Sequence, residues 1–249
     1  MRNISQLAVA ALICAASAGT AMAQCATVPT PDFCLNGLYN SNSLDGIYVS
    51  PYTATINGVQ TYVICDDFYN DVDLDESWTV QANSVTSAPT SGLFGTASPD
   101  SANHNAAVSQ GVNVTTGYEE VAWLSQQLIG SLSTMSSYDQ DLYSYAIWAV
   151  FDPNGVQAWL DSYGNSAFWT AVSGEVQTAS THTSGNFSNV TVYTPVGNET
   201  PNCCGVAQEF IAVGPMSAAE APAAATLAID FLGLGVLLFV FRRQRFAAR

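Results

Sequence analysis

The chain contains no lysine, and its five basic side chains are arginines at the two ends of the sequence: Arg2, Arg242, Arg243, Arg245 and Arg249. Twenty of its 249 residues are acidic, which gives a net charge of −15. A surface of this kind repels phosphate and anionic lipid, so we expect no nucleic-acid partner. Without cations for salt bridges, the carboxylates between the two ends must be solvated, hydrogen-bonded or bound to a metal.

Motifs of common catalytic sites are also missing. The sequence has no Gly-x-Ser-x-Gly elbow, no phosphate-binding loop and no paired-histidine metal motif. Its two histidines, His104 and His182, lie in polar stretches that fit no zinc pattern. No pair of acidic residues has a spacing that indicates glycosidase chemistry. We therefore expect a protein that is not an enzyme.

The N-terminus has the features of a secretory signal peptide. A positively charged start is followed by an apolar run over residues 7–16 and by the small residues Ala21 and Ala23. This pattern predicts cleavage between Ala23 and Gln24, so that residues 1–23 are removed. The apolar run is too short to span a membrane.

The C-terminal segment, residues 216–249, is expected to hold a transmembrane helix over residues 223–241. At ~1.5 Å per residue, this stretch nearly matches a hydrocarbon core of ~30 Å. The arginines that follow it predict a cytoplasmic C-terminus. Residues 24–215 are then expected outside the membrane, as an acidic extracellular domain.

The same segment resembles a known sorting signal. Glu220 and Pro222, the run Leu232-Gly233-Leu234-Gly235 and the cluster of Arg242, Arg243 and Arg245 resemble the PEP-CTERM tail. The resemblance implies a Gram-negative bacterium, export through the Sec translocon and an inner-membrane intermediate. It also implies that an exosortase-type transpeptidase removes the tail and passes the protein to the cell surface or extracellular matrix. The chain has Glu-Ala-Pro where the family has Pro-Glu-Pro, and a permanent membrane anchor is the alternative.

The clearest fold signal is Asn57-Gly58 between two β-rich runs, which predicts a β-hairpin with a type I′ turn. Residues 24–46 are expected to form a loop-rich lead-in, and residues 83–115, rich in Ser, Thr, Gly, Pro and Asn, a long surface loop. Further strands are expected at 77–82, 189–194 and 208–213, and helices at 116–130, 137–150, 156–163 and 166–176. The order predicts an α+β domain with antiparallel β-sheet elements (N-terminal hairpin and C-terminal strands), a central helical insert and one C-terminal transmembrane helix.

Five cysteines remain after signal cleavage, so at least one has no partner within the chain. Cys25 and Cys34 are a candidate local disulfide. Cys203 and Cys204 are adjacent, and one of them is a candidate partner for Cys65 or for the lead-in.

An acidic run follows Cys65. Asp71, Asp73 and Asp75 alternate along the chain like the start of a calcium loop, because hard cations need several carboxylate oxygens. The run departs from an EF-hand, since Glu76 stands where a glycine is required. Weak calcium binding and an acidic face leading into a strand are the two interpretations.

Several segments resemble the thioester domains of surface adhesins: Cys65-Asp66-Asp67-Phe68, Tyr118-Glu119-Glu120-Val121-Ala122-Trp123-Leu124 and Ala146-Ile147-Trp148. In those domains a cysteine thiol is joined to a glutamine amide two residues before the Ala-Ile-Trp segment. Cys65 matches the cysteine, but Ser144 occupies the glutamine position. Gln140, one helical turn earlier, is the nearest glutamine on that helix face.

We therefore expect an exported structural or adhesive protein of the cell surface or exopolysaccharide matrix, without a cofactor and with exopolysaccharide as a candidate partner. Exposed Tyr and Trp side chains are candidates for stacking on sugars. A covalent thioester adhesin and a calcium-dependent binding module are the alternatives.

Overall fold

A computed structural model describes residues 32–196 and 207–214 of the chain. The predicted hairpin is confirmed, since β4 (Tyr52–Ile56) pairs with β5 (Val59–Cys65) and places Ile56 opposite Val59. Asn57 and Gly58 have φ angles of 51° and 77°. Both lie in the left-handed region that a type I′ turn requires, which is why this dipeptide sets the register of the pair.

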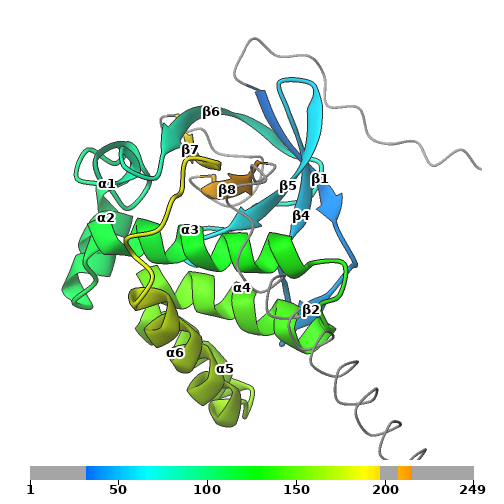
Figure 1. The fold of residues 1–249 in the computed structure, drawn as a ribbon, viewed down its shortest axis with the longest axis vertical. Coiled ribbons are helices and arrows are strands. Elements are labelled where there is room, and N and C mark those ends of the chain that lie inside the picture. The colour runs from blue at the N-terminus through cyan, green and yellow to red at the C-terminus, as the bar shows by residue number, and fades with distance from the viewer. Residues whose placement is uncertain (1–31, 197–206, 215–249) are drawn as a thin grey trace, which may run out of the picture.

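The hairpin is part of a closed barrel of six antiparallel strands in the order β1-β4-β5-β8-β7-β6 (Figure 1). The other four strands are β1 (Asp32–Leu38), β6 (Ser77–Ser84), β7 (Val190–Pro195) and β8 (Phe210–Val213). A small separate pair is formed by β2 (Ser43–Leu44) and β3 (Ile47–Tyr48). The predicted fold class, with sheet elements instead of a closed barrel, is therefore wrong.

Strand β1 is the main reason for the difference. It lies in the stretch predicted as a loop-rich lead-in, yet it pairs with β4 on one side and β6 on the other and so closes the barrel. Its side chains Phe33 and Leu35 are buried in the barrel interior. The ring centroid of Phe33 lies 4.8 Å from the ring centroid of Trp78 and 5.1 Å from that of Phe210. Residues of three strands therefore fill the barrel. Burial of aromatic rings on this scale stabilises the closed form.

All the described helices lie between β6 and β7. They are α1 (Ala88–Ser91), α2 (Ser101–Ser109), α3 (Val114–Ser131), α4 (Ser137–Phe151), α5 (Pro153–Ser162) and α6 (Ser166–Ser180). Side-chain caps fix several helix starts: Ser136 accepts a hydrogen bond from the Asp139 N–H, and Asp152 accepts one from the Gly155 N–H. Helix α3 begins earlier than predicted, because Asn113 caps it.

The predicted long loop over residues 83–115 is also wrong. The segment finishes β6 and contains α1 and α2. Its two large apolar side chains, Leu93 and Phe94, are fully buried, and Phe94 stacks on Phe151 of α4 with centroids 4.0 Å apart. These two anchors hold a segment whose composition alone is typical of a surface loop.

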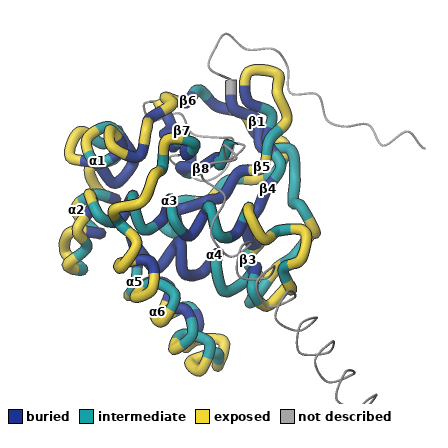
Figure 2. Tube along the Cα trace, in the orientation of Figure 1, coloured by how far each residue is buried: buried dark blue, intermediate teal, exposed yellow. Residues whose placement is uncertain are grey.

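A second core lies between the helices and the barrel. Helices α3 and α4 pack against each other, and they contact β8 and β5 respectively. Gly117 of α3 makes the close approach possible, since a Cβ there would lie 2.8 Å from the Phe151 ring. Figure 2 shows the buried residues concentrated along α3, α4 and the adjoining strands, with exposed residues on the outer helices. The helical insert therefore packs along one side of the barrel.

The predicted transmembrane helix over residues 223–241 lies outside the described residues. Within the described ranges, no helix has the length and apolar character needed to cross a bilayer.

Candidate functional site

The loop between β5 and β6 is folded around the side chain of Asp67. Its Oδ1 accepts hydrogen bonds from the backbone N–H groups of Tyr69, at 2.9 Å, and Asn70, at 3.2 Å, and its Oδ2 accepts one from Asn70 Nδ2 at 2.7 Å. Asp side chains favour such local turns because they bond the backbone two and three residues ahead. Burial raises the pKa of Asp67 to about 6, against the lowering effect of these hydrogen bonds. Its role in the loop is structural.

Two glutamines hold this loop from opposite sides. Gln208, just before β8, donates from Nε2 to the carbonyl oxygens of Asp67 (3.1 Å) and Asn70 (2.5 Å). Gln110, just after α2, donates to the Tyr69 hydroxyl at 2.6 Å and to Asp152 at 2.9 Å. The loop is thus fixed between the barrel and the helical insert, which pre-organises whatever binds against it.

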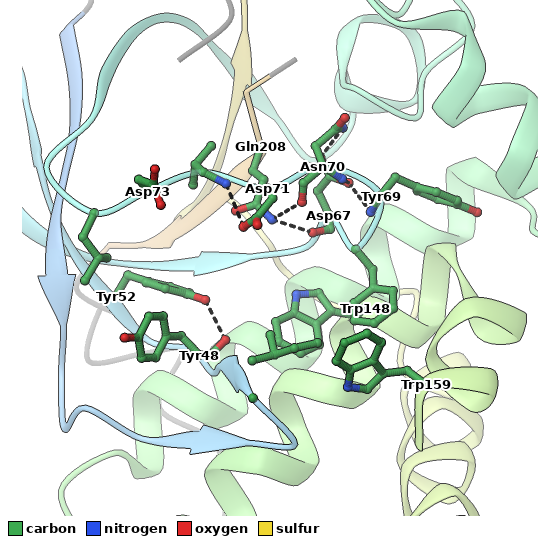
Figure 3. A pocket seen from close by; sticks show the side chains of 15 residues that line it. Tyr48, Tyr52, Asp67, Tyr69, Asn70, Asp71, Asp73, Trp148, Trp159 and Gln208 are labelled. Carbon is green, nitrogen blue, oxygen red and sulfur yellow. Dashed lines mark hydrogen bonds between the residues drawn. The ribbon is translucent and has the colours of Figure 1, made fainter. Parts of the chain in front are cut away.

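A pocket of about 560 Å³ opens beside this loop. Its lining comes from segments far apart in the sequence: residues 46–48, Tyr52, residues 67–74, Trp148, Trp159 and Gln208. Figure 3 shows the polar side chains of the loop and Gln208 on one side of the pocket and the rings of Tyr48, Tyr52, Trp148 and Trp159 on the other. A volume of this size fits a small-molecule or saccharide ligand.

Part of the aromatic side of the pocket is a connected group of rings. Phe68 contacts Trp148 and Trp159 with centroids 5.4 Å and 6.4 Å apart, and Trp159 contacts Tyr163 at 5.1 Å. Tyr48 is 52% exposed, whereas Trp148 is buried. The rings therefore run from the interior to the surface and offer flat apolar faces to a ligand.

Behind the pocket lies a buried pair of carboxyl groups, Asp66 and Glu209. Glu209 accepts hydrogen bonds from the Leu93 N–H (2.7 Å), the Tyr118 hydroxyl (2.7 Å) and the Thr194 hydroxyl (2.5 Å). Neither carboxyl oxygen of Asp66 has a hydrogen-bond donor among the described residues, although both are buried.

The two groups affect each other's ionisation. Burial, together with the charges of Glu209 and Asp67, raises the pKa of Asp66 well above its usual range. Burial also raises the pKa of Glu209 to about 7, even though three hydrogen bonds favour its charged form. Like charges in a buried site cannot easily coexist, so the pair retains a proton at a pH where isolated carboxyl groups have lost theirs.

The three aspartates predicted as a calcium site are only partly brought together. Asp71 and Asp73 line the pocket, whereas Asp75 is exposed and does not contribute to it. Over the described ranges, no group of three or more acidic, cysteine or histidine side chains is placed to hold a metal ion. Two of the three aspartates therefore contribute to the pocket.

The residues of the thioester resemblance are adjacent in space. Cys65 is buried and free, and its Sγ lies 3.2 Å from the carbonyl oxygen of Asp67. The Ser50 hydroxyl accepts from the Cys65 N–H, and the Ser50 carbonyl accepts from the Ser144 hydroxyl. Ser144 also donates to the carbonyl of Gln140, which is buried. Cys65 and Ser144, which occupies the position of the missing glutamine, are thus both hydrogen-bonded to Ser50.

Cys34 is disulfide-bonded. The other cysteine candidates, Cys25, Cys203 and Cys204, lie outside the described residues, as do the cleavage site (Ala23, Gln24) and the sorting residues (Glu220, Pro222, Arg242, Arg243, Arg245).

Comparison of the chain with family models, curated proteins and solved structures found no match. The site must therefore be interpreted from its own geometry. Sequence reasoning found Asp71 and Asp73 but missed Tyr48, Trp159 and Gln208, which belong to separate segments. The signal that was present is the pair Phe68-Tyr69 inside the acidic run, since aromatic side chains are unusual in a plain acidic surface.

Proposed function

We propose that this protein is an exported, non-catalytic component of the cell surface or exopolysaccharide matrix that binds saccharide in the pocket beside the β5–β6 loop. The observation that carries the proposal is the pairing of aromatic rings with carboxylate and amide oxygens in one pre-organised pocket. Sugar rings have apolar C–H faces and polar edges. A pocket with one aromatic side and one polar side complements both.

The charge of the protein restricts the saccharide. All Lys and Arg residues of the chain lie outside the described ranges, and Asp67, Asp71 and Asp73 line the pocket. A polyanion such as a uronic-acid polymer or a phosphorylated glycan would meet only repulsion there. Neutral and amine-bearing saccharides are the classes that remain.

A binding role, in place of catalysis, is supported by how Asp67 is used. Burial raises the pKa of this carboxyl to about 6. Both of its oxygens are already engaged in hydrogen bonds within the loop. These hydrogen bonds commit the carboxyl to holding the loop in place.

The route to the surface is proposed from the ends of the sequence. Export through the Sec translocon, cleavage after Ala23 and processing of the tail by an exosortase-type transpeptidase would leave the acidic domain outside the inner membrane. The PEP-CTERM-like arrangement of Glu220, Pro222 and the terminal arginines supports this route.

The proposal is tested on cells that express the full chain. We expect the protein to co-purify with the exopolysaccharide fraction, with an intact mass that starts at Gln24 and ends near residues 220–222. A mass that retains Arg249 would show a permanent anchor and contradict sorting. A trimmed protein that does not sediment with isolated matrix polysaccharide would contradict saccharide binding while leaving sorting intact.

A further inference from the structure

The polar groups on the pocket's polar side are almost all hydrogen-bond acceptors. Gln208 uses its Nε2 for two bonds to the loop, and its Oε1 has no partner in the described part of the chain. Asp71 accepts one bond, from the Val72 N–H at 2.9 Å, and the Asp73 carboxylate accepts none from the described residues. A ligand that satisfies this side must therefore bring donors.

The carboxylates stand close to aromatic rings. Figure 3 shows the Asp71 carboxylate between Gln208 and the rings on the opposite side of the pocket. Asp71 is near enough to Tyr52 to be one of the charges that raise the pKa of its hydroxyl, after the larger effect of burial. Carboxylates and aromatic faces both attract a cation, the first by its charge and the second by the quadrupole of the ring.

The described residues contain neither Lys nor Arg, so they supply no competing cation. A group that brings a positive charge and several N–H donors would match the acceptors, the carboxylates and the rings together. A protonated amine on a sugar has these properties, and the ring that carries it supplies the apolar face for Tyr48 and Trp159.

We infer that the pocket selects saccharides that carry free, protonated amines over their N-acetylated, neutral and anionic counterparts. This inference rests on the proposed saccharide binding and specifies its ligand class. It is carried by the predominance of acceptors on the polar side, the two exposed aspartates and the aromatic rings in one cavity. Acetylation of the amine would remove both its charge and two of its three donors.

The test is a titration of the full-length protein with two glucosamine oligomers of equal length, one with free amines and one fully N-acetylated. At about pH 6 the sugar amines are protonated. We expect the amine form to bind at least ~10-fold more tightly, because it adds a cation–π contact and a charge pair. This preference should shrink as salt is added.

Two substitutions that each remove one negative charge make the matched comparison. Asp71→Asn should weaken binding of the amine oligomer by roughly three- to fivefold. Asp75→Asn removes the same charge from an exposed position outside the pocket, and Asn tolerates its φ of 68°. It should change affinity by less than about twofold, since only long-range screened charge is lost.

Three other outcomes would contradict the inference, and one of them would also contradict the proposed function. Equal or tighter binding of the acetylated oligomer would overturn the inference and leave saccharide binding in place. Failure of both oligomers and of the isolated matrix polysaccharide to bind would overturn the proposed function as well. If a linear polyamine such as spermidine binds as tightly as the amine oligomer, the pocket recognises amines and not amino sugars, which would also overturn the inference.

Discussion

Asp66→Asn is expected to raise the melting temperature at about pH 8 by roughly 5 °C and to flatten the dependence of stability on pH. The wild-type carboxyl is buried beside Glu209, and none of the described residues donates a hydrogen bond to it. When both groups are ionised, the folded state contains two buried like charges. Asparagine removes one charge and brings an amide that can donate to the Glu209 carboxylate, so the substitution should stabilise the protein despite changing a fully buried residue.

The direction of the pH dependence follows from the raised pKa values. The folded protein holds protons on the pair that the unfolded chain, with its ordinary carboxyl pKa values of 3.8 and 4.5, has released. Their contribution is fully present below the unfolded values and is lost as the pH rises through the folded pKa, which is about 7 for Glu209. Wild-type stability should therefore fall by about 3 kcal/mol between about pH 4 and pH 7.

Thermal unfolding of the two proteins from about pH 4 to pH 8 measures both effects. Asp161→Asn is the matched control, because it removes the same charge from an exposed position on α5. It should leave the pH profile unchanged. Loss of stability in Asp66→Asn at about pH 8, or an unaltered profile, would contradict the buried pair as described.

Tyr48→Ala is expected to weaken saccharide binding by about tenfold, because it removes an exposed ring face from the pocket at a cost of roughly 1 kcal/mol or more. Tyr48 is 52% exposed and its hydroxyl makes no hydrogen bond in the described structure, so the fold should tolerate the change. Trp159→Ala removes a larger ring and should reduce binding further. Because Trp159 also packs against the helices, the thermal stability of the Trp159→Ala variant must be measured in parallel.

The controls for these variants match them in residue type. Tyr138 is 54% exposed on α4, outside the pocket, and contacts Phe168 instead. Trp123 stacks on His182 with centroids 4.4 Å apart, on α3. Co-sedimentation with matrix polysaccharide should be retained in Tyr138→Ala and Trp123→Ala. If the pocket variants and the controls behave alike, binding does not occur in this pocket.

The sequence predicted local structure better than it predicted the closure of the fold. Asn57-Gly58 specified the hairpin because the turn geometry is encoded in two adjacent residues. Closure of the barrel depends on β1 pairing with β6, more than forty residues away, where Phe33 stands opposite Trp78. Such pairings between distant segments leave no periodic signal in a single sequence.

The same limit explains what was missed at the site. Asp71 and Asp73 were candidates because their spacing is visible along the chain. Their partners in the pocket are Tyr48 from β3, Trp148 from α4 and Trp159 from α5, which only the folding of the insert against the barrel brings together. Composition was misleading for residues 83–115, since a few buried apolar side chains, above all Leu93 and Phe94, anchor that segment.

Hydrogen–deuterium exchange of the full-length protein, with and without a saturating glucosamine oligomer, tests the central claim most directly. If the pocket beside the β5–β6 loop is the binding site, added protection should be strongest in residues 46–48 and 67–74. The outer face of α6 should exchange at the same rate in both states. Protection elsewhere with none in these two segments would show that the pocket is not the site at which this protein binds saccharide.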